Sequence, residues 1–169
     1  MHNLILNKDE LDEFRNNEEN KSRVIYIGHF RRDIYEDLAR FNYEILFFNL
    51  SFPADVWLKY NALANGKLPD AIICDMELPD TDAITLFNSL KSNPYLSRIP
   101  FIVLSTENSS LARIKAYEAG IDDFYHIEVP AEDLHERISI LKEIKNSKEN
   151  KQNVRKSQLT IINNRIITR

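Results

Sequence analysis

The sequence predicts an α/β protein in three layers, with one doubly wound parallel sheet built from five β–α repeats. Five short runs rich in β-branched and aromatic residues alternate with segments whose apolar residues recur at i, i+3 and i+4. The middle runs, residues 70–74 and 100–104, are nearly continuously apolar, as strands of a parallel sheet covered on both faces must be. Because crossovers between parallel strands are right-handed, such repeats give an open sheet with helices on both faces.

The expected elements alternate along the chain without internal repeats. The strands are expected, in order, at residues 23–27, 43–48, 70–74, 100–104 and 123–127. The helices are expected at residues 31–41, 53–65, 82–90, 109–119 and 131–145. Their apolar faces are, in the same order, Ile34/Leu38/Phe41, Val56/Trp57/Tyr60/Leu63, Ile84/Phe87/Leu90, Ile114/Tyr117 and Leu134/Ile138/Leu141. Gly120 is expected to end the fourth helix, because glycine readily adopts the left-handed backbone found at helix ends.

Segments of different composition flank this unit, which spans residues 22–146. Residues 1–21 form an acidic, Asn- and Glu-rich extension, expected to be a loose arm or a short added helix. Residues 147–169 are basic and indicate a linker, with a short hairpin of two β runs around Asn163-Asn164. A hairpin alone is barely stable in water, so this end is expected to dock, to self-associate or to lead into an effector region.

Charge is divided unevenly along the chain. Residues 142–169 carry eight Lys and Arg and two acids, a net charge of +6, which leaves −10 for residues 1–141 of a chain whose net charge is −4. An acidic body argues against nucleic-acid binding by the body itself. The basic end suits a membrane surface, an RNA or an acidic partner, or is simply a solvated helix end.

Several features of the sequence indicate a cytoplasmic protein. No apolar run approaches the roughly 18 residues of a membrane span, and residues 1–19 show no signal-peptide pattern. The single cysteine, Cys74, excludes an internal disulfide and suits a reducing compartment. Cys74 lies in an apolar run and is expected to be a buried core thiol.

Three strings in the sequence resemble one known family. Pro69–Asp80 contains a hydrophobic strand that ends in Asp75 and continues through a short loop to a proline. Ile99–Ser105 is a strand that ends in a hydroxyl residue, and Ala116–Phe124 contains the run Glu-Ala-Gly-Ile-Asp-Asp-Phe. In this order and spacing, over about residues 23–145, they are similar to the CheY-like receiver domains of response regulators. The resemblance implies a flavodoxin-like (βα)5 fold with strand order 2-1-3-4-5.

The resemblance also implies roles for individual residues. The family uses two acids after the first strand to hold Mg²⁺, a phospho-accepting Asp, a hydroxyl residue that contacts the phosphoryl group, and a Lys that pairs with it. Asp75 is then the phospho-acceptor candidate, Ser105 the phosphoryl contact, and Phe124 the aromatic residue that couples activation to the surface. The cations are needed because an Asp cannot attack a phosphate group carrying about two negative charges unless that charge is offset.

The remaining parts of the family's site are replaced in this chain. Gly28 and His29 stand where the acidic pair is expected, and Ile127 stands at the position of the Lys. A two-residue insertion would place Val129 there instead, so neither alignment supplies a lysine. Two unlike charges ~4 Å apart attract each other by roughly 4 kcal/mol at an effective dielectric near 20. Losing both cations, Mg²⁺ and the Lys, is therefore expected to slow the reaction by orders of magnitude. Ordinary phosphorylation is therefore not expected, and no cofactor is expected unless an atypical site binds Mg²⁺.

Each retained residue also has a plain structural interpretation. Asp75 can accept N–H bonds from a loop, Ser105 can cap the next helix, and Phe124 can be a packed core ring. His29 with Asp75 and Glu77 is a weak candidate for a transition-metal site, because histidine and carboxylates suit such ions better than they suit Mg²⁺.

Three functions follow as hypotheses. The first is a pseudo-receiver of bacterial two-component signal transduction, which binds a protein partner or a second copy through its fourth helix, fifth strand and fifth helix. That face is expected to include Arg113, Tyr117, Tyr125 and His135. The second is a phospho-accepting response regulator or phosphorelay member that uses Asp75 in an atypical site. The third is a small enzyme or nucleotide binder, which three scattered glycines disfavour because phosphate-binding turns are glycine-rich.

A further alternative concerns the length of the protein. Receiver-like domains also precede enzymatic domains, including membrane-associated sugar transferases. The resemblance therefore leaves open that this chain, which is not itself expected to be an enzyme, is the N-terminal regulatory domain of a larger one.

Overall fold

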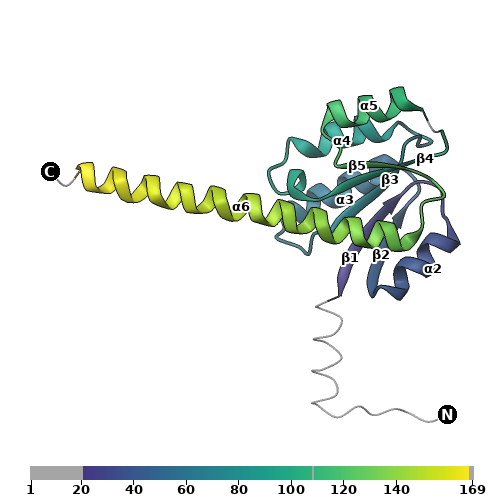
Figure 1. The fold of residues 1–169 in the computed structure, drawn as a ribbon, viewed down its shortest axis with the longest axis horizontal. Coiled ribbons are helices and arrows are strands. Elements are labelled where there is room, and N and C mark those ends of the chain that lie inside the picture. The colour runs from purple at the N-terminus through teal and green to yellow at the C-terminus, as the bar shows by residue number, and fades with distance from the viewer. Residues whose placement is uncertain (1–20, 108, 168–169) are drawn as a thin grey trace, which may run out of the picture.

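The computed structural model describes residues 21–107 and 109–167, with the backbone alone at residues 149 and 154–167. It contains one five-stranded sheet in the order β2-β1-β3-β4-β5, in which all neighbouring strands are parallel, and this confirms the predicted fold (Figure 1). The strands are β1 (Ser22–Ile27), β2 (Tyr43–Phe48), β3 (Ala71–Asp75), β4 (Phe101–Ser105) and β5 (Asp123–His126). Each strand begins and ends within one residue of its predicted position.

Helices cover both faces of the sheet. They are α2 (Arg32–Arg40), α3 (Ser51–Leu63), α4 (Ala83–Lys91), the 3-10 helix η1 (Leu96–Arg98), α5 (Ser110–Ala119) and α6 (Ala131–Ile167). Core contacts place α3, α4 and α5 on one face, and α2 with the first part of α6 on the other. Gly120 ends α5 with a φ of 100°, in the left-handed region, as predicted.

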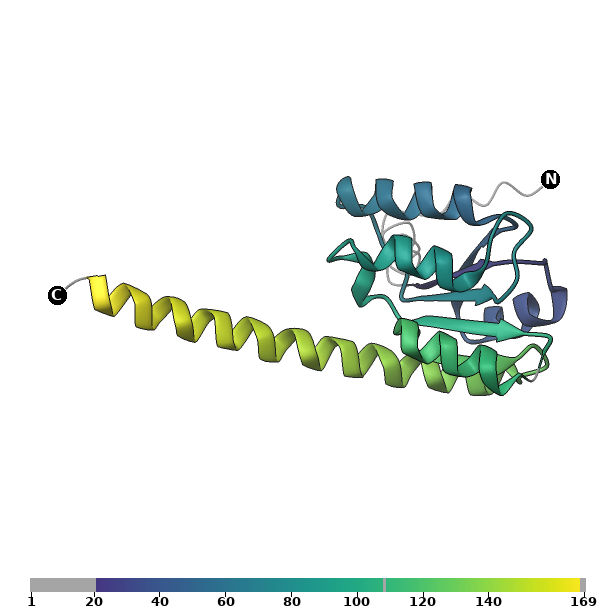
Figure 2. The ribbon, with the colours of Figure 1, turned by 90° about the horizontal axis from the view of Figure 1, so that it is seen from above.

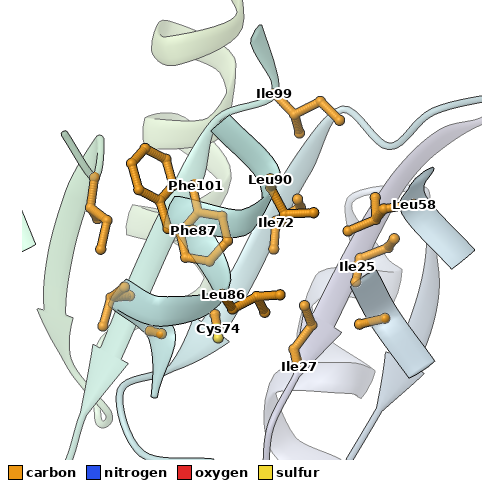
Figure 3. Packing of buried hydrophobic residues seen from close by; sticks show 14 of the residues in the cluster. Ile25, Ile27, Leu58, Ile72, Cys74, Leu86, Phe87, Leu90, Ile99 and Phe101 are labelled. Carbon is orange, nitrogen blue, oxygen red and sulfur yellow. The ribbon is translucent and has the colours of Figure 1, made fainter. Parts of the chain in front are cut away.

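The alternation of side chains along the strands creates two cores. Ile25 of β1 faces α3, α4 and α5, whereas its neighbour Tyr26 faces α2 and α6. The first core is shown in Figure 3, where Phe87 of α4 packs edge-on against Phe101 of β4 with ring centroids 5.2 Å apart. Cys74 lies in the same core with no exposed surface. Its burial raises the pKa of the thiol, which keeps the sulfur protonated, so the prediction of a core thiol is confirmed.

The prediction was wrong about which face of α3 packs on the sheet. Val56, Tyr60 and Leu63 were predicted to face the core, but they point outward and are 49–82% exposed. Of the predicted face only Trp57 is partly buried against the core. The residues that pack inward instead are Ala54, Leu58 and Ala62. Both stripes of this helix are apolar, so periodicity alone cannot choose between them. The stripe with two alanines lets the helix lie closer to the sheet.

The end of the chain forms a helix rather than a hairpin. α6 runs without a break from Ala131 to Ile167 and extends far beyond the sheet (Figure 1). The hairpin predicted around Asn163-Asn164 is therefore wrong, because both residues are helical. A helix satisfies its backbone hydrogen bonds within one segment, whereas a two-stranded hairpin with no sheet to join is only marginally stable.

Two lysines of the basic end fix α6 to the body. Lys142 Nζ lies 2.7 Å from Asp70 Oδ1, and Lys145 Nζ lies 2.7 Å from Asp122 Oδ2. Asp70 directly precedes β3 and Asp122 directly precedes β5. These lysines therefore hold the helix across the amino ends of the strands, and only the basic residues beyond them belong to the protruding part.

One residue predicted for the partner face lies elsewhere. The ring of His135 stacks on Phe41 with centroids 4.2 Å apart and an interplanar angle of 7°. Its Nδ1 lies 3.0 Å from the hydroxyl of Tyr43. His135 therefore packs towards α2 and β2, because its position on α6 lies on the α2 side of the buried stripe that includes Leu134.

Two predictions concern membranes and the start of the chain. No helix among residues 21–107 and 109–167 is long and apolar enough to cross a membrane. Of the acidic extension predicted at residues 1–21, residues 1–20 lie outside the described part of the chain.

Candidate functional site

The carboxyl ends of four strands surround a pocket of about 390 Å³. Asp75 ends β3 and Ser105 ends β4, while His29 and Ile127 follow β1 and β5. The parallel sheet brings these strand ends to one edge, which is where such folds bind ligands. The pocket thus unites these four residues with Glu77, all of them singled out from the sequence.

The carboxylate of Asp75 is held by the protein on both oxygens. The hydroxyl of Tyr26 donates to Oδ1 at 2.7 Å, and the backbone N–H of His29 donates to Oδ2 at 2.8 Å. The His29 ring lies alongside, with Nδ1 3.6 Å from Oδ2. The side chain of Asp75 is only 7% exposed. Asp75 therefore joins the strand end to the loop after β1, in agreement with its plain structural interpretation.

Gly28 makes this arrangement of Asp75 possible. Its φ is +148°, a conformation that residues with a side chain rarely adopt. A Cβ at this position would lie 2.2 Å from Asp75 Oδ2. The carboxylate of Asp75 thus occupies the space that a side chain at position 28 would need. The glycine at position 28 and the placement of Asp75 are two parts of one packing arrangement.

Tyr26 is a residue of the site that sequence reasoning missed. It lies inside β1, pairs in register with Ile73 of β3, and stacks on Phe47 with ring centroids 6.0 Å apart. Burial, and then the hydrogen bond to Asp75, raise the pKa of its phenol, so the hydroxyl stays protonated and donates. The available signal was a hydroxyl-bearing ring among the aliphatic residues Val24, Ile25 and Ile27, two positions before Gly28.

Arg31 is the second residue that was missed, and it brings a cation to Ile127, the residue predicted to stand at the position of the family's lysine. It comes from the loop before α2, and its Nη1 donates to the backbone carbonyl of Ile127. Its Nη2 pairs with Asp33 at 2.5 Å, and the side chain lines the pocket. An alignment could not reveal this, because Arg31 lies 96 residues before Ile127 in the chain.

Ser105 stabilises the turn that follows β4. It is 6% exposed, and its Oγ accepts a hydrogen bond of 3.1 Å from the backbone N–H of Glu107. Its carbonyl accepts from the N–H of Ile127 at 2.9 Å. Ser105 thus lines the pocket while it joins the loops after β4 and β5.

Phe124 does not line the pocket. Its ring is 2% exposed and belongs to the core beneath α4 and α5. The guanidinium of Arg113 from α5 lies 5.5 Å from the ring centroid, which is within the range of cation–π attraction. Phe124 is therefore a packed core ring, and the guanidinium of Arg113 lies over it.

The donor groups present do not fit Mg²⁺. This ion requires near-octahedral oxygen ligands at about 2.1 Å, and Gly28 and His29 supply no carboxylate next to Asp75. In the described part of the chain, no three His, Cys, Asp or Glu side chains are grouped so that they could hold a metal ion. The weak candidate set of His29, Asp75 and Glu77 is therefore not assembled as a metal site.

Comparison with known proteins agrees with the fold. A family model described as the response regulator receiver domain matches residues 54–139, half of the chain. The chain is 28% identical over 94 residues to the chemotaxis protein CheY1 of Helicobacter pylori, across 56% of this chain and 73% of that protein. It is 33% identical over 63 residues to the response regulator PleD of Caulobacter vibrioides, across 37% of this chain. It spans only 14% of the length of PleD.

Solved structures share the fold at lower identity. A receiver domain protein from Clostridium thermocellum superposes with a TM-score of 0.65 at 19% identity, over 74% of this chain and 97% of that one. The receiver domain of the sensor histidine kinase PA1611 from Pseudomonas aeruginosa, which has a magnesium ion coordinated in its active site cleft, has a TM-score of 0.62 at 16% identity. It covers 73% of this chain and 98% of that one. The family match includes β3, β4 and β5 and begins after Gly28 and His29. By its fold and this match, the chain belongs to the response regulator receiver domain family.

Proposed function

We propose that this protein is a receiver-type regulatory module that binds other proteins and does not depend on ordinary Mg²⁺-dependent phosphorylation of Asp75. The observation that carries the proposal is the pair of hydrogen bonds on Asp75, from the Tyr26 hydroxyl and the His29 N–H. A nucleophilic carboxylate needs an exposed oxygen directed at the incoming phosphorus. Here both oxygens already have donors, in a side chain that is 7% exposed.

The charges at the pocket support the same proposal. Glu77 adds a second carboxylate, and an incoming phosphoryl group would meet both negative charges without a bound metal ion to offset them. The guanidinium of Arg31 is engaged with the carbonyl of Ile127 and with Asp33. Phosphoryl transfer to Asp75 would require the guanidinium to leave these partners and Asp75 to leave Tyr26.

The proposed partner surface is the face of α5, β5 and α6. Ile114 on α5 and Ile140 on α6 are 52% and 39% exposed and lie on this face. Between them, Asp123 accepts from the hydroxyls of Tyr117 and Tyr125 at 2.8 and 3.2 Å. Exposed aliphatic groups beside aromatic rings held in fixed positions suit a protein partner or a second copy.

The test is exposure of the whole chain to Mg²⁺ and acetyl phosphate, followed by intact-mass measurement. We expect no phosphoryl adduct, while a phosphorylatable receiver in the same mixture gains one. An adduct on the wild-type chain that disappears in Asp75→Asn would contradict the proposal. Asp80→Asn is the matched control, because Asp80 lies on the same loop but binds the start of α3.

A second candidate function is a phospho-accepting response regulator with an atypical site. Arg31 favours it, because this residue supplies a cation beside Ile127, where the family has its lysine. Ser105 remains at the end of β4. In the same mass experiment, this function requires an adduct that is lost in Asp75→Asn and reduced in Arg31→Gln.

The larger setting of the module is also a proposal. The chain spans 14% of PleD and 30% of the transcriptional regulator PhoP of Escherichia coli, which supports a role as the regulatory part of a longer protein, an enzyme such as a sugar transferase included. We place it in the cytoplasm, with the basic part of α6 directed at an acidic partner or a membrane surface. Sequencing the source gene beyond residue 169 would test whether the module is part of a longer protein.

A further inference from the structure

The outer side of α3 carries an apolar stripe with no described cover. Its members are Phe52, Val56, Tyr60 and Leu63, which are 72%, 49%, 68% and 82% exposed. At about 100° per residue, these positions fall within an arc of roughly 80° on the helix. Leu63, Phe52 and Tyr60 are the three most exposed large hydrophobic residues in the described part of the chain. Their gathering on one helix indicates a docking surface rather than scattered exposure.

The stripe is held in a fixed position. Lys59 Nζ binds Asp55 Oδ2 at 2.8 Å and Ser89 Oγ of α4 at 2.7 Å, and Ser89 in turn binds Asp55 at 2.9 Å. These three polar contacts join α3 to α4 beside the stripe. Figure 2 shows α3 at the outer boundary of the molecule, with no described segment over its outer side.

The size of the stripe favours an occupant from the same chain. A 13-residue helix is about 20 Å long and about 10 Å wide, so its outer face offers a footprint of roughly 200 Å². A stable interface between separate proteins needs about 800 Å² from each partner. A tethered segment binds at an effective concentration of order millimolar, so a small contact suffices.

The described chain starts beside the end of α3. The carbonyl of Lys21 accepts a 2.7 Å hydrogen bond from Nζ of Lys67, and Arg23 Nη1 donates to the carbonyl of Lys67 at 2.9 Å. Lys67 follows Leu63, the last residue of the stripe, by four positions. The preceding segment, residues 1–20, is therefore attached at one end of the stripe.

Residues 1–20 have the length and the chemistry to cover the stripe. Twenty residues span about 30 Å as a helix and about 66 Å when extended, against about 20 Å for α3. Besides Met1, the segment contains five large apolar residues, which are Leu4, Ile5, Leu6, Leu11 and Phe14. It has six acids and two bases, which suits Lys21 and Lys67 near the end of α3. We propose that residues 1–20 fold back along α3 and cover the stripe of Phe52, Val56, Tyr60 and Leu63.

Disulfide formation in the whole chain tests the proposal. Leu11→Cys is paired with Tyr60→Cys on the stripe, and in a control protein with Ile140→Cys on the opposite side of the sheet. Native Cys74 has no exposed surface and does not interfere. We expect an intramolecular disulfide about tenfold more abundant in the stripe pair, because docking raises the local concentration. Equal yields in both pairs, or none in either, would overturn the proposal.

A second measurement separates an occupant within the chain from a second copy. Tyr60→Cys alone reports a second copy if it forms an intermolecular disulfide, and that result would also overturn the proposal. In the whole chain, Leu11→Ser with Phe14→Ser should raise the fluorescence of a hydrophobic dye severalfold. The same change should have no effect on a chain that already carries Phe52→Ser and Tyr60→Ser. Neither readout depends on whether Asp75 is phosphorylated.

Discussion

The hydroxyl of Tyr26 in β1 donates a 2.7 Å hydrogen bond to Oδ1 of Asp75 at the end of β3, 49 residues later in the chain. Removing this donor with Tyr26→Phe leaves a buried carboxylate oxygen without that partner. The expected loss is about 1–3 kcal/mol of unfolding free energy. Urea unfolding followed by the fluorescence of the single tryptophan, Trp57, measures it. Tyr95→Phe is the control, because Tyr95 is 55% exposed, and an equal loss in both variants would refute the role given to Tyr26.

A side chain at position 28 should destabilise the fold because it would clash with Asp75. Gly28→Ala places a Cβ 2.2 Å from Asp75 Oδ2 at a φ of +148°, so we expect a loss of about 2–4 kcal/mol. Combining it with Asp75→Ala should recover part of this loss, since the closest contacts, with Oδ2 and Cγ of Asp75, disappear, while the contact with its Cβ at 2.7 Å and the backbone strain remain. Gly66→Ala is the matched control, because its Cβ meets the end of the flexible Asn61 side chain. Strict additivity of Gly28→Ala and Asp75→Ala would show that the two positions do not interact.

Stability should fall at alkaline pH through the partly buried Tyr125. Burial, and then the negative charge of Asp123, raise the pKa of Tyr125 from 10.0 to about 12. Above pH 10 the unfolded chain loses a proton that the folded chain keeps. The contribution of Tyr125 to the free energy of unfolding is therefore complete below pH 10 and is lost as the pH rises towards 12. Urea midpoints between pH 9 and pH 12 would show a shallower decline in Tyr125→Phe, and a decline identical to that of the wild type would exclude this source.

The attachment of α6 should depend on Lys145 and not on the next lysine along the helix. Lys145 Nζ binds Asp122 Oδ2 at 2.7 Å and the carbonyl of Ile99 at 3.0 Å, and both members of the ion pair are only 17% exposed. Lys145→Met should therefore cost about 1–3 kcal/mol of stability. Lys148→Met changes an exposed residue and should cost little. Thermal unfolding monitored by circular dichroism distinguishes the two, and equal melting temperatures would contradict the attachment.

The strands and the strand-end residues could be read from the sequence because they depend on local patterns. An apolar run that ends in Asp75 or Ser105 predicts a buried parallel strand and places its last side chain at the ligand edge. The two stripes of α3 could not be told apart in this way. The choice between Leu58 and Tyr60 depends on how closely the helix can approach the sheet, which is a property of the folded layers.

The contacts that determine the state of the site are long-range, and local patterns do not reveal them. Tyr26 is unremarkable as a strand residue until register places its hydroxyl at Asp75. From the sequence, Arg31 is only the residue at the start of a helix. Its role becomes visible in the fold, where the loops after β1 and β5 meet and its guanidinium donates to the carbonyl of Ile127. Similarly, Asp80 accepts hydrogen bonds from the N–H groups of Ser51 and Phe52 at the start of α3, nearly thirty residues earlier. A helix start without a cap of its own gave no indication of where its partner lies.

Because α6 is 37 residues long, a small tilt where it contacts the sheet would move its far end by a larger distance, as a lever does. Beyond Lys145, which binds Asp122 before β5, it continues for about 33 Å at 1.5 Å per residue. A tilt of about 5° where the helix rests on the sheet would displace its far end by about 3 Å. Small rearrangements among Lys142, Lys145 and their aspartates are thereby amplified into displacements comparable with the diameter of a water molecule. The lever needs no phosphoryl group, only a ligand or partner that changes how α6 rests on the body.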